Sequence, residues 1–309
     1  MGRAAAFAIP LIVLDLLVRP VDDVTWGITR WVDTIDSSLG GNGANTSSAI
    51  ARLGVDSKLL GMTGPDAFGE QCRQILAGHG VDLSAIAQGA EATATSIVLI
   101  QSSGARTFLH RPGSSREVFS DGVALPEGCA HYHLANVFAL PNLRAQAPAV
   151  LKQARAMNMT TSLDTAWDAR GEWMKILEPC LPELDILFVN EDEARMLSGS
   201  TDPLTNARFF RERGARTFVM KRGAAGCDVF TGDAHWHAPA YAVDAIDTTG
   251  AGDCFAGGFL AALQRGYTLE NAAGLANAVG GMVVEKLGAT TGLRGWDETL
   301  AWQRAHQTL

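Results

Sequence analysis

The segment with the clearest capacity for chemistry is residues 247–253, which read Asp-Thr-Thr-Gly-Ala-Gly-Asp and lead into an apolar, helix-like run. Gly250, Ala251 and Gly252 stand where a loop enters a helix, and the first backbone N–H groups of a helix have no partner inside it. With the helix dipole, these donors favour an anion such as a phosphate group. Asp253, in the first helical turn, could then accept the proton of an attacking hydroxyl group. The alternative is that this aspartate only caps the helix.

A second segment, residues 40–45, reads Gly-Gly-Asn-Gly-Ala-Asn and also precedes a predicted helix. Its glycines let the backbone approach a ligand, and the amides of Asn42 and Asn45 both donate and accept hydrogen bonds. Such pairs match a polyhydroxylated ligand. A glycine turn with an asparagine helix cap is an equally good interpretation. The segment is not a Walker A loop, because no Gly-Lys-Ser/Thr sequence closes it, and it lacks the spacing of a dinucleotide fingerprint.

The elements that must position these segments follow from periodicity and turn residues. Strands alternate with helices, which predicts an α/β fold with a mainly parallel central sheet and helices on both faces. The predicted strands are 11–18, 161–163, 184–189, 217–220 and 227–230, and the predicted helices are 45–53, 67–77, 143–157, one from about 191, 203–213, 253–263 and 269–286.

The alternation breaks at residues 20–36 and 92–111, where strand follows strand. Residues 25–35 suit an exposed strand pair, and 93–110 suit a hairpin around Ser103-Gly104. We expect the two regions to form a small sheet beside the ligand edge of the main sheet, where it would act as a lid. A free edge of this lid could pair with a second copy of the chain, so a homodimer through the lid is one expected assembly.

Composition narrows the class of protein. The chain has 309 residues, 47% hydrophobic and 19% charged, with a formal net charge of -8. These values suit a globular enzyme, and we treat residues 1–309 as one domain. The acidic balance argues against nucleic acid as a partner. No apolar run approaches membrane-spanning length, and residues 1–20 suit a buried strand better than a signal peptide. Five cysteines without CxxC spacing favour reduced, buried thiols in the cytoplasm.

The two segments resemble, in order, both signatures of the ribokinase-like carbohydrate kinases, also called the phosphofructokinase-B type. The first signature runs from Gly40 through Asn45 to Gly64, and the second from Asp247 to Leu260. The resemblance covers nearly the whole chain. Its other parts are Asp15 as the first-strand aspartate, residues 93–108 as the lid hairpin, Asn190-Glu191-Asp192-Glu193-Ala194 as the Asn-Glu-x-Glu-Ala loop, and Gly223-Ala224-Ala225-Gly226 as the nucleotide-side turn.

This resemblance implies a kinase that transfers the γ-phosphoryl group of ATP to a hydroxyl group of a sugar or sugar-like molecule, with Mg²⁺. The implied residues are Asp253 as general base; Gly250, Ala251 and Gly252 as the anion hole; Asp15, Gly41, Asn42 and Asn45 for the sugar; Asn190 and Glu193 for Mg²⁺ and its waters; Gly223, Gly226 and Asn277 along the nucleotide; and Asp247 and Thr249 for a monovalent cation such as K⁺. Alternatives are a nucleoside kinase of the same fold and a non-catalytic sugar or nucleotide sensor. The intact base and anion turn argue against the sensor.

Two positions depart from the family pattern. Pro10 stands where a glycine usually precedes the aspartate, five positions before Asp15. Gly288-Ala289 leads into Thr290-Thr291-Gly292, without the serine or similar residue that often accompanies bound potassium. The second departure weakens the expectation of a K⁺ site.

Several residues allow a structural interpretation beside a functional one. The pairs His131/His133 and His235/His237 could bind zinc, but no third and fourth ligands follow with recognisable spacing, so structural or surface roles are favoured. The remaining open cases are Asp164 as a substrate or magnesium residue or a helix cap, Lys221-Arg222 as phosphate-neutralising or solvated, and Trp26 and Trp31 as stacking or strand-packing residues.

Overall fold

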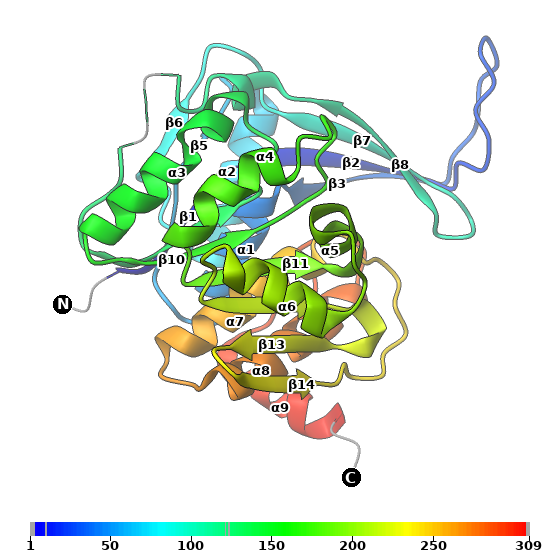
Figure 1. Cartoon of the computed structure of the whole chain (residues 1–309). Helices are drawn as coiled ribbons and strands as arrows, with labels where there is room; N and C mark the ends of the chain where they lie inside the picture. The colour runs from blue at the N-terminus through cyan, green and yellow to red at the C-terminus, as the bar shows by residue number, and fades with distance from the viewer. Residues whose placement is uncertain (1–3, 10, 121, 123, 307–309) are drawn as a thin grey trace.

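The computed structural model describes residues 4–9, 11–120, 122 and 124–306, so Pro10 lies outside the described part. Its largest sheet has the strand order β14-β13-β12-β11-β10-β9-β1-β4 (Figure 1). Neighbouring strands from β12 to β4 are parallel, whereas β13 is antiparallel to both β12 and β14. The bounds are β1 (Ala4–Ile9), β4 (Ser57–Leu59), β9 (Cys129–Ala135), β10 (Thr160–Asp164), β11 (Ile186–Asn190), β12 (Thr217–Lys221), β13 (Cys227–Thr231) and β14 (Ala234–Ala238). The predicted α/β fold with a mainly parallel sheet is confirmed.

Helices cover both faces of this sheet because its central strands are apolar on both sides. Along β11, Leu187 and Val189 pack into one core cluster, and Ile186 and Phe188 into another. The first cluster contains α3 (Pro141–Ala156), α4 (Met174–Leu177), α5 (Glu191–Ser198) and α6 (Pro203–Glu212), and the second contains α1 (Asn42–Arg52), α7 (Ala251–Gln264), α8 (Leu269–Val284) and α9 (Trp296–His306). A third cluster contains α2 (Ala67–His79) and β6 (Ile86–Gln88), which pairs with β5 (Gly61–Thr63). Short 3₁₀ helices span Gly113–Arg116, Glu178–Glu183 and Gly223–Ala225.

Glycines in α7 let it pack closely on its two neighbouring helices. A Cβ at Gly257 would lie 2.6 Å from Cβ of Ala49 in α1, and a Cβ at Gly258 would lie 2.9 Å from Cγ2 of Val279 in α8. This close packing fixes the start of α7 beside the start of α1. Both predicted motifs lie at these two helix starts.

A second sheet has the order β3-β2-β7-β8 and lies at one end of the main sheet (Figure 1). Its strands are β2 (Val13–Arg19), β3 (Thr34–Gly40), β7 (Thr95–Ile100) and β8 (Arg106–Arg111). The β7–β8 hairpin confirms the strands predicted within residues 92–111. That this sheet closes over a ligand remains a prediction.

The strand pair predicted for residues 25–35 is wrong, and so is most of the lid segment predicted for 20–36. The first two strands of the second sheet flank that interval, and residues 20–33 form a loop that projects from the body (Figure 1). Trp26 and Trp31 are 96% and 92% exposed. Aromatic residues favour strands because they pack on a half-buried sheet surface, and these two side chains have no such surface beside them. The strand predicted for residues 11–18 is present as β2, but it pairs in the second sheet. Asp15 therefore lies on the second strand of the chain, not the first.

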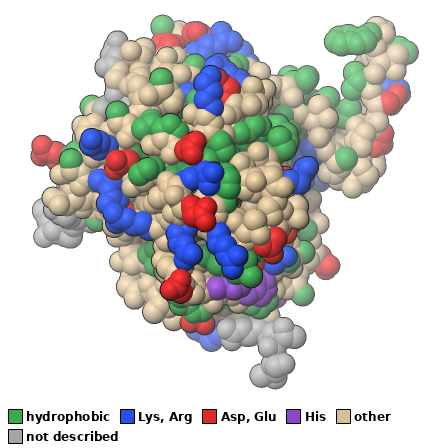
Figure 2. Space-filling view, in the orientation of Figure 1, with side chains coloured by type: hydrophobic (Ala, Val, Ile, Leu, Met, Phe, Trp, Pro, Cys, Tyr) green, Lys and Arg blue, Asp and Glu red, His purple; other side chains and the backbone are tan. Residues whose placement is uncertain are grey.

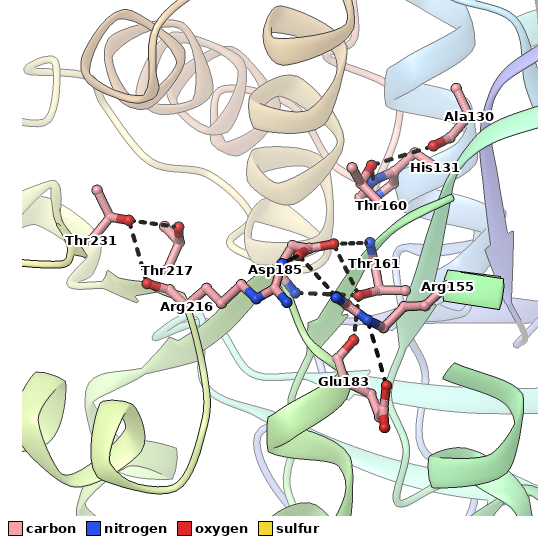
Figure 3. Close-up of polar contacts among 10 residues, drawn as sticks. All are labelled: Ala130, His131, Arg155, Thr160, Thr161, Glu183, Asp185, Arg216, Thr217 and Thr231. Carbon is pink, nitrogen blue, oxygen red and sulfur yellow. Dashed lines mark hydrogen bonds and ion pairs between the residues drawn. The ribbon is translucent and has the colours of Figure 1, made fainter. Parts of the chain in front are cut away.

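A polar cluster holds the opposite end of the main sheet, where the parallel strands begin (Figure 3). Asp185, just before β11, accepts hydrogen bonds from Arg155 at 3.0 Å and Arg216 at 2.9 Å. It also accepts the backbone N–H of Thr161, at 2.9 Å. These contacts join the starts of β10, β11 and β12, which helps to hold the strand register.

None of the described helices combines the length and apolarity needed to cross a membrane. All five cysteines are unpaired and buried, as their spacing predicted.

Candidate active site

The first turns of α1 and α7 meet at the carboxyl end of the main sheet. Nδ2 of Asn42 donates to Oδ1 of Asp253 at 2.8 Å, and Nδ2 of Asn45 donates to Oδ2 at 2.9 Å. Oγ1 of Thr46 donates to the Asp253 backbone carbonyl at 3.1 Å. The fold therefore brings together two segments more than 200 residues apart in sequence.

Both helix-capping interpretations are wrong. The N-cap residues are Gly41 for α1 and Gly250 for α7, and neither helix start has a side-chain cap among the described residues. Instead, the side-chain amides of Asn42 and Asn45 each donate a hydrogen bond to the Asp253 carboxylate. The free donors of the α7 start thus remain available to a ligand.

The two cap positions require glycine for conformation and for space. Gly41 has φ +94, and a Cβ there would lie 2.4 Å from the carbonyl oxygen of Leu11. Gly250 has φ +71, and its Cβ would lie 2.5 Å from Cβ of Ala289. Any other residue would shift the helix start and the donors that it presents.

A buried ion pair lies beside the anion-binding turn. Nζ of Lys221, at the end of β12, lies 2.5 and 2.7 Å from the carboxylate oxygens of Asp164, at the end of β10. The lysine side chain is 12% exposed, and a Cβ on Gly252 would lie 3.2 Å from its Nζ. Burial opposes the charged form, but Asp164, Glu193 and Asp253 together raise the pKa of Lys221. The solvated interpretation of Lys221 is therefore wrong, as is helix capping by Asp164.

The electrostatics around Asp253 suit a proton acceptor. Burial raises the pKa of Asp253, hydrogen bonds from Asn42 and Asn45 and the charge of Lys221 lower it, and Glu193 raises it, with a net rise. A raised pKa makes the ionised carboxylate a stronger acceptor for the proton of a reacting hydroxyl group.

Asp15 lies in the same region on β2 and is 7% exposed. Its pKa is raised to about 6 as the net effect of burial and the charges of Asp247 and Asp253, which raise it, and a hydrogen bond from Ser96, which lowers it. A Cβ on Gly40 would lie 2.1 Å from its Oδ2, so any side chain at position 40 would displace the Asp15 carboxylate.

Asn190 and Glu193 form the capping box of α5. The Asn190 side chain accepts the Glu193 N–H at 2.8 Å, and Oε2 of Glu193 accepts the Asn190 N–H at 3.0 Å. Thr165 donates to the same Oε2 at 2.7 Å. The second oxygen of this buried carboxylate makes no hydrogen bond within the described part of the chain, and the charge of Glu193 acts on Lys221 and Asp253. This oxygen could contact the hydration shell of a metal ion.

The predicted nucleotide-side residues lie around the end of the β13–β14 hairpin. Gly223 and Gly226 have positive φ, and a Cβ on Gly226 would lie 2.1 Å from the carbonyl oxygen of Ala238. Nδ2 of Asn277 donates to the carbonyl oxygens of Ala238 and Pro239 at 2.9 and 3.1 Å. Asn277 thus holds the end of β14 beside the glycine turn.

The two residues expected to bind a monovalent cation contact an arginine instead. Nη1 of Arg106, on β8 of the second sheet, lies 2.7 Å from Oδ1 of Asp247 and 2.7 Å from Oγ1 of Thr249. The sequence prediction did not include Arg106, because nothing in a single chain links position 106 to position 249.

Asn136 was also missed. It follows β9, and its Nδ2 donates to Oδ1 of Asn42 at 3.0 Å, which orients the Asn42 amide toward Asp253. A polar residue at the carboxyl end of a central strand is a signal that could have indicated it.

The histidine pairs have polar protein partners. His131 and His133 both contact the Ser162 hydroxyl at 2.7 Å, and His235 and His237 contact Asp228 at 2.8 and 3.2 Å. These contacts fit the structural interpretation of both pairs.

Comparison with known proteins finds relatives both in sequence and in structure. The chain is 30% identical to aminoimidazole riboside kinase of Salmonella typhimurium, over 86% of this chain and 88% of that one. It is 32% identical to a fructokinase of Klebsiella pneumoniae, over 77% and 80% of the two chains. A solved structure of a ribokinase-type protein from Escherichia coli, in complex with ATP and Mg²⁺, superposes with a TM-score of 0.87 at 24% identity, over 98% of this chain and 100% of that one.

The structural likeness shows the ribokinase-like fold, and the sequence relatives are kinases of sugars and of a riboside. The model of the pfkB family carbohydrate kinases matches residues 11–295, which is most of the chain. The predicted class, a carbohydrate kinase, is confirmed. The chain belongs to the pfkB family of carbohydrate kinases.

Proposed function

We propose that this chain transfers the γ-phosphoryl group of ATP to a hydroxyl group of a sugar or sugar-like molecule, with Asp253 as general base. The observation that carries the proposal is the Asp253 carboxylate, held by Asn42 and Asn45 at an uncapped helix start with Lys221 beside it. A protein that only bound sugars would not need a carboxylate of raised pKa at an anion-binding turn.

The acceptor sugar would lie between the second sheet and the start of α1. Asp15, Asn42 and Asn45 supply acceptors and donors for its hydroxyl groups, and the backbone of Gly41 allows close approach. The hydroxyl group that reaches Asp253 would lose its proton to the carboxylate while its oxygen attacks the γ-phosphorus. The bond from that phosphorus to the bridging oxygen of ADP breaks, and ADP leaves.

Charge on the transferred phosphoryl group would be stabilised by the N–H groups of Gly250 and Gly252, which have no partner within the described part of the chain, and by the ammonium group of Lys221. The Ala251 N–H between them donates to the Thr248 carbonyl oxygen at 3.3 Å and would have to exchange this bond for a phosphate oxygen. The two free N–H groups and the ammonium group are already in place before the reaction, so little reorganisation opposes it. ATP would lie along Gly223, Gly226 and Asn277, with its γ-phosphate toward α7.

The residues present fit a hydrated Mg²⁺ ion. No group of three or more His, Cys, Asp or Glu side chains that could hold a metal occurs among the described residues. Magnesium in kinases keeps several waters and binds through one or two carboxylates and the substrate phosphates. Glu193 and Asn190, at the end of β11, would hold such waters. When bound, the ion would offset the charge of the phosphate oxygens.

The test is ADP release by the full chain with ATP, Mg²⁺ and a panel of hexoses, pentoses, sugar acids and nucleosides. We expect turnover with at least one acceptor and its loss in excess chelator. A nucleoside as the sole acceptor would move the assignment to the nucleoside kinase alternative. Measurable ligand binding without turnover on any acceptor would instead identify a sensor, and undiminished activity in chelator would exclude the magnesium assignment.

Asp15→Asn should stabilise the fold at high pH while weakening the sugar complex. The folded pKa of about 6 exceeds the ordinary 3.8, so stability falls as pH rises between these values, and the ionised group is a cost above pH 6. About two pKa units correspond to about 3 kcal/mol. We expect the variant to melt a few degrees higher than the parent chain at pH 8, with no such gain at pH 4. Sugar affinity at pH 8 should fall. An equal difference in melting temperature at pH 4 and pH 8 would show that the raised pKa of Asp15 is not the cause of the stabilisation.

We extend the proposal to a homodimer through the lid. Residues 20–33 project from the body and carry hydrophobic side chains at their tip (Figure 2), and most of β8 is exposed. Exposed patches of this kind mark association surfaces. Sedimentation velocity at several protein concentrations would report the assembly.

The five unpaired cysteines favour a reducing compartment, which is consistent with the cytoplasm.

A further inference from the structure

A lid side chain reaches the loop that precedes the anion-binding turn. The side chain of Arg106 is 13% exposed and that of Asp247 is 1% exposed. Their contact at 2.7 Å is thus largely shielded from water, where an ion pair is stronger and less screened by salt than at the surface. The same Nη1 donates to Thr249 at 2.7 Å. One guanidinium group therefore joins the second sheet to residues 247–249.

Asp247 joins two further segments of the chain. Its Oδ1 accepts the backbone N–H of Thr249 at 2.7 Å, and its Oδ2 accepts the backbone N–H of Gly288 at 2.8 Å. Its own N–H donates to the carbonyl oxygen of Val284 at 3.1 Å. The carboxylate thus holds the loop before α7 against the turn after α8, and its negative charge needs a positive partner at this depth.

Asp247 and Thr249 are the residues for which the sequence resemblance predicted a monovalent cation site, and their contacts do not fit one. The guanidinium group lies against the carboxylate oxygen and the hydroxyl oxygen that face the lid. It is permanently charged and would repel a second cation nearby. Gly288-Ala289 also leads into Thr290-Thr291-Gly292, without the serine or similar residue that the sequence resemblance associates with bound potassium. This departure agrees with the poor fit to a cation.

We infer that Arg106 takes the place of the monovalent cation, so that the lid itself supplies the charge that balances Asp247. This inference rests on the proposed kinase function. An open cavity of about 370 Å³ separates the hairpin tip from the loop and is lined by Gly104, Arg106, Phe108, Thr248 and Thr249. Arg106 spans this gap. The shape of the Thr248–Gly252 turn thus depends on the position of the lid, and no K⁺ is required.

The unaltered chain should show the same turnover and the same melting temperature in potassium, sodium and choline chloride at equal ionic strength. Arg106→Ala should lower turnover about 10- to 100-fold in choline chloride, the effect of losing hydrogen bonds to a charged group. K⁺ or millimolar methylguanidinium should restore at least several-fold of that loss. The variant should also melt higher in potassium chloride than in choline chloride. Arg106→Gln, which keeps a donor for Thr249 without the charge, should respond in the same way.

Arg111→Gln is the matched control, because Arg111 lies on the same strand and donates to the carbonyl oxygen of Thr93 at 2.9 Å, away from Asp247. Its melting temperature should not respond to K⁺. Activation of the unaltered chain by K⁺ would overturn the inference. So would Arg106 variants in which neither K⁺ nor methylguanidinium changes melting or turnover. The melting comparison needs no substrate, so it decides this point even if the proposed kinase activity fails.

Discussion

Asp253→Asn is expected to lower turnover by about 100- to 10,000-fold, the range that general-base catalysis supplies. Asparagine cannot take up the hydroxyl proton at neutral pH. The donors of the α7 start and Lys221 would remain in place, so sugar and ATP should still bind. The loss should therefore appear in kcat and leave the dissociation constants nearly unchanged.

The fold should tolerate Asp253→Asn because its hydrogen bonds to the two asparagine side chains can rearrange. Asp253 accepts from two amide groups, and the new amide would place its NH₂ group against one of them. Oδ1 of Asn45 is buried with no hydrogen-bond partner among the described atoms. A flip of the Asn45 amide would present this oxygen to the new donor and restore the pair. Removing a carboxylate whose pKa burial has raised also removes a cost of folding.

The matched control is Asp202→Asn, another exchange at a helix start. Asp202 caps α6 and accepts the Thr205 N–H at 2.7 Å, away from the site. Turnover, sugar affinity and melting temperature should all stay close to the unaltered values. If Asp253→Asn keeps more than about a tenth of the turnover, the loss is smaller than a general base supplies, and Asp15 becomes the next candidate. If it unfolds while Asp202→Asn does not, the aspartate is primarily structural.

The sequence predicted the two helix starts well, since local physics determines much of each. Gly41 and Gly250 have positive φ and no space for a Cβ, so glycine at these positions reports the backbone directly. The strands of the second half were also predictable, because apolar runs such as residues 184–189 alternate with capped helices. Local patterns of this kind carry their information within a few residues.

The second sheet and the charge pairs were less predictable because their partners are distant in sequence. The first two strands of the second sheet pair across an exposed loop that carries two tryptophans, and composition alone assigned the strands to that loop. Arg106 meets Thr249 across 143 positions, and Lys221 meets Asp164 across 57. Nothing in one chain distinguishes such an arginine or lysine from a solvated one.

Lys221→Met is expected to lower turnover by about 100- to 1,000-fold, the usual effect of removing one donor from a site that stabilises developing charge. The ammonium group lies beside the turn formed by residues 250–252, held there by both oxygens of Asp164. A positive charge fixed at this point favours the transition state more than the ground state. The expected loss therefore lies mainly in kcat, with a smaller change in the KM for the acceptor.

The single exchange leaves Asp164 buried without its partner, which alone could destabilise the fold. The double variant Lys221→Met/Asp164→Asn removes both charges and separates the two effects. If Lys221 acts on the phosphoryl group, the double variant should recover melting temperature but not turnover. If the lysine only neutralises Asp164, both should recover. Lys58→Met is the control. Lys58, on β4, forms an ion pair with Asp82 at 3.1 Å near the surface. This variant should keep turnover within about twofold, because surface ion pairs contribute little. A double variant with normal turnover would show that Lys221 does not act on the phosphoryl group.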